Sequence, residues 1–125
     1  MTDLTELSSR IETIERGYEY LLAYAAQGRQ EEQGSEVRDR LGEMFKSLHG
    51  LGELFAKVAI ASGAVPATVG PFLDAVKQDA AKARGAIGLV LSRPAISSLL
   101  VDNLNASIHL RALLTDCFLF EQAYK

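Results

Sequence analysis

The chain has 125 residues, of which 48% are hydrophobic and 23% are charged, the composition of a globular domain instead of a disordered chain. This length is that of one ordinary domain, so we expect residues 1–125 to fold as a single unit. The net charge is −3, and because the basic residues are dispersed among acids, nucleic acid is not an expected partner.

No segment of the sequence has the character of a secretion signal or a membrane span. The chain does not start with a basic segment followed by an apolar one, and no stretch approaches about 18 uninterrupted apolar residues. The single cysteine, Cys117, excludes an intramolecular disulfide and agrees with a reducing compartment. We therefore expect a cytoplasmic protein without a membrane span.

The first predicted helix covers residues 4–27. Its apolar side chains recur alternately three and four positions apart, which is the spacing of one buried stripe. They are Leu4, Leu7, Ile11, Ile14, Tyr18, Leu21 and Ala25. Asp3 and Glu6 have the spacing of a capping box, and Gly28 ends the helix and opens a polar connector.

A second long helix is predicted from Ser35, the expected N-cap, to residues 62–63. Its apolar stripe consists of Val37, Leu41, Met44, Leu48, Leu51, Phe55 and Val58. Gly42, Gly50 and Gly52 lie in its interior, where each costs about 1 kcal/mol relative to alanine. We expect a kink or a close approach by another backbone at these glycines.

The third helix is expected to begin at Pro71, because proline suits the first helical position, and to end before Pro94. The connector that precedes it, residues 63–70, is small and apolar, so we expect it to be packed down. A small-molecule pocket, if one is present, is expected to be walled by the small residues of this helix. They include Ala75, Ala80, Ala81, Ala83, Gly85, Ala86 and Gly88.

The fourth helix is expected to follow Pro94 as one rod of about 45 Å, against about 30 Å for the third helix. It is apolar on two flanks and so has more surface to bury than one bundle core accepts. We expect its last turns to project past the third helix and to form a self-association interface. The residues of this predicted interface are Leu113, Leu114, Phe118, Leu119 and Phe120.

The four predicted helices are joined by connectors of about 8, 8 and 2 residues. Such short connections favour antiparallel neighbours. The sequence therefore predicts an all-α, antiparallel, up-down-up-down four-helix bundle. The apolar surplus of the fourth helix predicts a homodimer or a dimer of dimers.

His49 is the candidate phosphoacceptor. It falls one position off the apolar stripe of the second helix, so we expect it to be exposed. Residues 47–53 resemble the histidine phosphotransfer domains of bacterial phosphorelays, four-helix bundles whose histidine sits in a His-x-Leu-Lys-Gly pattern. His49 and Leu51 match this pattern, whereas Gly52 and Glu53 replace its Lys and Gly. The resemblance implies phosphotransfer through His49, with the favourable cation of the pattern missing.

A metal site is not predicted. Di-iron bundles need Glu-x-x-His on two helices, and Lys46 and Ala106 stand where the glutamates would be. Asp102, His109 and Asp116 form a polar stripe at heptad spacing. Each is about 10 Å from the next along the helix axis, which is too far for one ion.

No catalytic residue and no cofactor are predicted. Cys117 lies on the apolar stripe of the fourth helix with no histidine within two turns, so we expect a buried structural thiol. The sequence has no nucleophile elbow, P-loop or dinucleotide-binding glycine pattern. The expected function is a non-enzymatic, cytoplasmic assembly, adaptor or regulatory role through self-association and an unidentified protein partner. A relay through His49 and a small-molecule or metal sensor are the alternatives.

Overall fold

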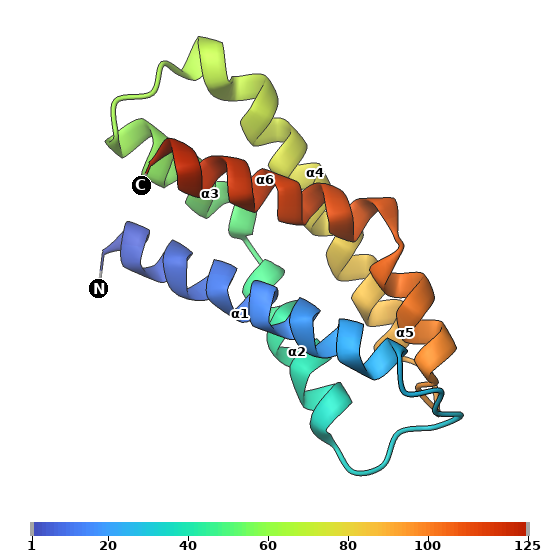
Figure 1. Ribbon diagram of the computed structural model, residues 1–125. Coiled ribbons are helices and arrows are strands. Elements are labelled where there is room, and N and C mark those ends of the chain that lie inside the picture. The colour runs from blue at the N-terminus through green and yellow to red at the C-terminus, as the bar shows by residue number, and fades with distance from the viewer. Residues whose placement is uncertain (1, 125) are drawn as a thin grey trace.

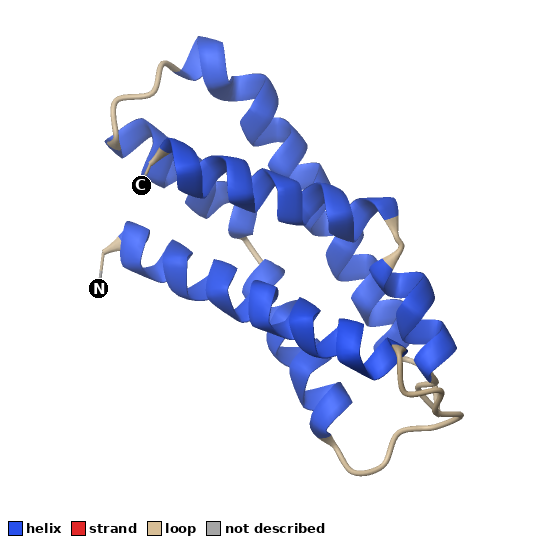
Figure 2. Ribbon diagram, viewed as in Figure 1, coloured by secondary structure: helices blue, strands red, loops and turns tan. Residues whose placement is uncertain are grey.

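The computed structural model describes residues 2–124, which fold into six helices (Figures 1 and 2). They are α1 (Asp3–Ala25), α2 (Glu36–Leu48), α3 (Leu51–Ala61), α4 (Pro66–Leu91), α5 (Ser98–Asn105) and α6 (Ile108–Ala123). The described residues contain no strand, so the predicted all-α class is confirmed. The four-helix bundle is not confirmed, because six helices are found where four were predicted.

α4 is the element around which the others gather. It packs against α2, α3 and α6 and also contacts α5, while α1 packs against α2, α5 and α3. Buried apolar side chains from all six helices form one core. In Figure 1, α1 begins and α6 ends at the same end of the molecule.

The predicted second helix is broken at His49 and Gly50. Gly50 has a φ of 68°, a left-handed conformation that only glycine adopts without strain. α2 therefore ends at Leu48 and α3 begins at Leu51. The expected close approach occurs two residues later, where a Cβ built on Gly52 would lie 2.8 Å from the Cα of Lys77.

The predicted fourth helix is also broken, at Ala106 and Ser107, and forms α5 and α6. The end of α5 is tied to α1, because the buried Asn105 donates its Nδ2 hydrogen to the carbonyl oxygen of Leu21. With 16 residues, α6 is about 24 Å long. The expected single rod of about 45 Å is wrong.

α4 begins at Pro66 instead of at the predicted Pro71. Pro66 takes the first turn, where its missing N–H costs nothing, and Pro71 follows inside the helix. The connector from α3 is shorter than predicted. The expectation that residues 63–70 pack down is confirmed in part, because Ala64 and Val69 pack against the core whereas Val65 is 59% exposed. The added turns bring Val69 and Phe72 beside the C-terminal turns of α6.

The connectors are held by side chains at the end where α1 finishes. Glu32 accepts a hydrogen bond from the backbone N–H of Ile96 at 2.8 Å and pairs with Arg38. Arg38 in turn donates to the carbonyl oxygens of Leu91 and Arg93. These contacts join the connector after α1 to the connector after α4.

The start of α1 differs in one detail from the prediction. Thr2 is the N-cap, and its Oγ1 accepts a hydrogen bond from the backbone N–H of Thr5 at 3.1 Å. Asp3 and Glu6 lie in the first turn, where their charges favour the positive end of the helix dipole. The helix is therefore capped by Thr2, one residue before Asp3, where the capping box was predicted to begin.

Candidate functional site

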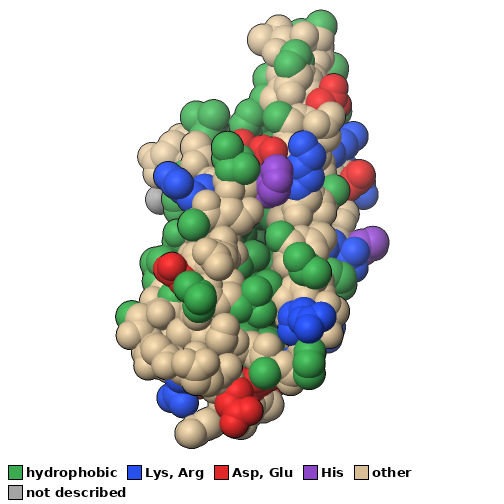
Figure 3. All heavy atoms as spheres, turned by 90° about the vertical axis from the view of Figure 1, so that its right-hand side faces the viewer, with side chains coloured by type: hydrophobic (Ala, Val, Ile, Leu, Met, Phe, Trp, Pro, Cys, Tyr) green, Lys and Arg blue, Asp and Glu red, His purple; other side chains and the backbone are tan. Residues whose placement is uncertain are grey.

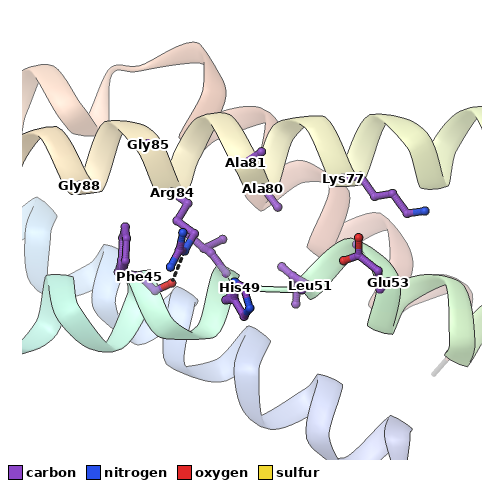
Figure 4. A pocket seen from close by; sticks show the side chains of 13 residues that line it. Phe45, His49, Leu51, Glu53, Lys77, Ala80, Ala81, Arg84, Gly85 and Gly88 are labelled. Atoms are coloured by element: carbon purple, nitrogen blue, oxygen red, sulfur yellow. Dashed lines mark hydrogen bonds between the residues drawn. The ribbon is translucent and has the colours of Figure 1, made fainter.

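A cleft of about 520 Å³ lies between α4 and the junction of α2 with α3 (Figure 4). α4 contributes a wall of small residues, Ala80, Ala81, Gly85 and Gly88. A Cβ built on Gly85 would meet no atom within 4 Å, so the space in front of this glycine is open. The prediction that a pocket would be walled by the alanines and glycines of this segment is confirmed.

Arg84 is held in the cleft by Phe45 of α2. Its guanidinium carbon lies 3.8 Å from the centroid of the Phe45 ring, and its Nε donates to the Phe45 carbonyl oxygen at 3.3 Å. Gly88 makes room for the ring, since a Cβ there would lie 3.3 Å from Phe45 Cε2. Among residues 2–124, the two terminal nitrogens of Arg84 have no hydrogen-bond or ion-pair partner.

The opposite end of the cleft carries one cation and one anion. Figure 4 shows Lys77 of α4 and Glu53 of α3 at this end, away from Arg84. Lys77 and Arg84 together carry two positive charges against one negative charge on Glu53. The cleft therefore has a net charge of one positive unit when His49 is neutral.

His49 lines the cleft and is exposed, as predicted. It does not lie inside a helix, because it is the C-cap of α2 with extended backbone angles. Its carbonyl oxygen accepts a hydrogen bond from the guanidinium of Arg10 in α1. The resemblance to phosphotransfer domains implies a helix-borne histidine, whereas this chain presents His49 at a helix break.

The predicted self-association residues divide into two groups. Leu113, Leu114 and Phe120 are at most 4% exposed and belong to the core of the single chain. Phe118 and Leu119 are 49% and 59% exposed. The expected projection of all five is wrong, because the predicted rod is broken and Leu113, Leu114 and Phe120 face the core from the short helix α6.

An apolar groove of about 240 Å³ remains between the first turns of α4 and the last turns of α6. It is lined by Ala59, Thr68, Val69, Phe72, Leu73, Leu119, Phe120, Ala123 and Tyr124, none of which is charged. We call this hollow the α4–α6 groove. Figure 3 shows another face of the molecule, on which hydrophobic side chains are also exposed between Lys, Arg and His side chains.

The predicted polar stripe is divided by the helix break. Asp102 lies on α5, whereas His109 and Asp116 lie on α6. Asp116 faces Asp79 of α4, and burial together with the Asp79 carboxylate raises the pKa of Asp116 to about 7. One Asp116 oxygen, Oδ2, is buried without a hydrogen-bond partner. Throughout the described chain, no three His, Cys, Asp or Glu side chains are placed to hold one metal ion.

Cys117 is fully buried on α6, which confirms the prediction of a buried thiol. Burial is the main cause that raises the pKa of this thiol to about 12, and the carboxylate of Asp116 adds to it. A thiol of this kind is a poor nucleophile near neutral pH.

Sequence reasoning did not identify Lys77 and Arg84 as lining residues. Both lie on the wall that it did identify, and their spacing of seven puts them on one face of a helix together with Gly88. That spacing is the signal that would have found them.

Comparisons with protein-family models, curated proteins and solved structures find no match for this chain. Over the part of the chain that the structure describes, no helix has the length and apolar character needed to cross a membrane.

Proposed function

We propose that this protein acts by binding, as a non-enzymatic, cytoplasmic assembly, adaptor or regulatory protein that associates with a second copy of itself. One observation carries the proposal: the α4–α6 groove has no charged lining residue, and the exposed Leu119 stands at its border. An uncharged hollow next to an exposed apolar side chain is typical of a surface that binds protein.

The outer face of α6 favours a second copy as the occupant. Its exposed residues are Ile108, His109, Arg111, Thr115, Phe118, Leu119, Gln122 and Ala123. Apart from the histidine, only Arg111 in this set is ionisable. Two copies with a charge of −3 each repel one another, so they approach most easily where the surface is nearly neutral.

A two-fold axis matches the arrangement of the groove and its neighbours. In a two-fold dimer, the same patch of both copies meets, so one surface must supply both a projection and a hollow. Leu119 supplies the projection, and the space beside Val69 and Phe72 supplies the hollow. Leu119 of each copy then fills the α4–α6 groove of the other.

Light scattering on variants tests this proposal. Leu119→Asp places a charge at the groove and is expected to reduce the measured mass to that of one chain. Leu22→Asp is the matched control, because Leu22 is 48% exposed on α1 and lies outside the groove. Equal masses for the two variants and the unmodified protein would contradict the proposal, provided that circular dichroism shows intact helices.

Phosphotransfer through His49 is a second candidate function. The sequence pattern lacks a lysine after Leu51, but His49 lines the same cleft as Lys77 and Arg84. These two side chains give the cleft cations that favour a phosphoryl group.

The relay is tested with potassium phosphoramidate as the donor. An imidazole nitrogen of His49 would attack phosphorus and form an N–P bond, while the P–N bond of the donor breaks and ammonia leaves. Phosphorus NMR should show a phosphohistidine signal that is lost in His49→Gln and kept in His109→Gln, since His109 is exposed on α6 outside the cleft. A signal that survives in His49→Gln would rule this function out.

A further inference from the structure

We propose that the cleft between α4 and the α2–α3 junction binds a small molecule that carries a carboxylate, with Arg84 as its main ligand. This site goes beyond the proposed self-association, because the cleft and the α4–α6 groove share no lining residue. Either site can therefore be present without the other.

Arg84 is oriented before any ligand arrives. Its stacking on Phe45 and the hydrogen bond from Nε fix the plane of the guanidinium. The two terminal nitrogens form the free edge of a rigid fork, whose geometry matches the two oxygens of a carboxylate. A side chain that is already immobile loses little conformational entropy when it binds a ligand.

The charges of the cleft match a single negative charge. Lys77 and Arg84 are positive, and Glu53 at the Lys77 end of the cleft is negative. A ligand with one carboxylate at Arg84 neutralises the net positive charge. A ligand with more negative charge would meet repulsion from Glu53.

The first turn of α3 adds weaker attraction for an anion. Leu51, Gly52 and Glu53 begin this helix and line the cleft, and backbone N–H groups in a first turn have no partner within their helix. Gly50, the N-cap, provides no side chain to satisfy them. These groups carry partial positive charge on the same side as Lys77.

The wall of small residues leaves room for the uncharged part of the ligand. Pockets that bind small molecules have volumes of roughly 300–1,000 Å³, and the cleft falls within this range at about 520 Å³. Ala81 and Gly85 present an apolar surface without long side chains. A compact ring or short aliphatic chain fits this surface while its carboxylate reaches Arg84.

Benzoate and benzamide are the probes, because they share a ring and differ in the charge of one group. We expect benzoate to shift the NMR signals of Arg84 Nε, Gly85 and the first turn of α3 in a saturable manner, with a Kd of about 1 mM for a ligand of this size. We expect no saturable shift with benzamide. Equal binding of both probes, or no saturable benzoate shift at these signals, would overturn the proposal.

Three variants locate the binding. Arg84→Gln should weaken benzoate binding about tenfold, since it removes a charge-assisted, bidentate contact. Lys82→Gln makes the same charge change on the same helix outside the cleft and should leave the Kd unchanged. Gly85→Leu fills the open space in front of Gly85 and should abolish binding while raising the melting temperature, because leucine favours a helix over glycine.

The variants also separate binding from folding. A loss of affinity in Gly85→Leu together with a raised melting temperature cannot be caused by unfolding. Equal affinities of Arg84→Gln and Lys82→Gln would show that Arg84 is not the ligand and would overturn the proposal. Dimerisation measured by light scattering is a separate readout, so failure at either site is distinguishable.

Discussion

Gly52 of α3 lies against Lys77 of α4 so closely that a Cβ on the glycine would fall 2.8 Å from the lysine Cα and 2.3 Å from its Cγ. The lysine Cα belongs to the backbone of a long helix and cannot move aside cheaply. We expect Gly52→Ala to lower the free energy of unfolding by roughly 1–3 kcal/mol, measured by urea denaturation.

Gly42→Ala is the matched control for this substitution. Gly42 is also helical, and a Cβ there would meet no atom within 4 Å. This variant is expected to gain about 0.5–1 kcal/mol of stability, because alanine has the higher helix propensity. If both variants gained stability, the close packing of α3 on α4 would be wrong.

The carboxyl of Asp116 makes stability depend on pH. Its pKa is raised from 3.8 to about 7 by burial and by Asp79, so the folded protein keeps a proton that the unfolded chain releases between these values. Stability is therefore expected to fall as the pH rises through this window. Glu15 of α1 acts in the same direction, since burial and Glu121 of α6 raise its pKa.

Asp116→Asn is expected to reduce the loss of stability at high pH, because asparagine stays neutral at every pH. The variant should melt a few degrees above the unmodified protein at about pH 8, and its advantage should shrink toward about pH 5. Asp102→Asn changes an exposed aspartate on α5 and serves as the control. A constant melting difference between Asp116→Asn and the unmodified protein across this range would refute the pH effect.

Glu32 is expected to stabilise the fold in the opposite pH direction. The hydrogen bond from the Ile96 N–H is the main cause that lowers the pKa of Glu32, and Arg38 contributes further. This stability is present above the pKa of the unfolded chain and is lost as the pH falls through the lower folded value. Glu32→Gln should lower the urea midpoint at neutral pH, whereas Glu31→Gln, at an exposed neighbour, should not. The difference should disappear in acid; if it persisted there, the charge of Glu32 would not be its source.

Cys117 is expected to resist thiol reagents in the folded protein. A pKa of about 12 instead of 9.0 leaves about a thousandfold less thiolate, and burial blocks access as well. Reaction with a disulfide reagent, followed by absorbance, should be slow in buffer and fast in concentrated urea. Rapid, stoichiometric labelling of native protein would show that α6 does not cover this thiol.

The sequence predicts those helix ends that are set by residues next to them in the chain. The ends near Gly28, Gly63 and Ser92 follow from glycine and proline, which act within one or two residues. No glycine or proline marks the break after Asn105. There the end of α5 is held by the hydrogen bond from Asn105 to Leu21, two residues that are 84 positions apart in the chain. Contacts of this kind cannot be read from periodicity.

The cleft was predictable in its wall and not in its chemistry. The alanines and glycines of α4 have little or no side chain and leave space beside the helix, so the place of a pocket follows from the sequence. The orientation of Arg84 depends on the ring and carbonyl group of Phe45, 39 positions away. The start of α4 was not predictable either, because Pro66 and Pro71 both suit the first turn of a helix.

Sedimentation equilibrium of the unmodified protein tests self-association most directly. At tens of micromolar we predict a mass of twice 13.6 kDa, or a multiple of that dimer, with dissociation on dilution. Leu119→Asp at the same concentration should sediment as one chain. A strictly monomeric mass of 13.6 kDa for the unmodified protein across this range would contradict the account.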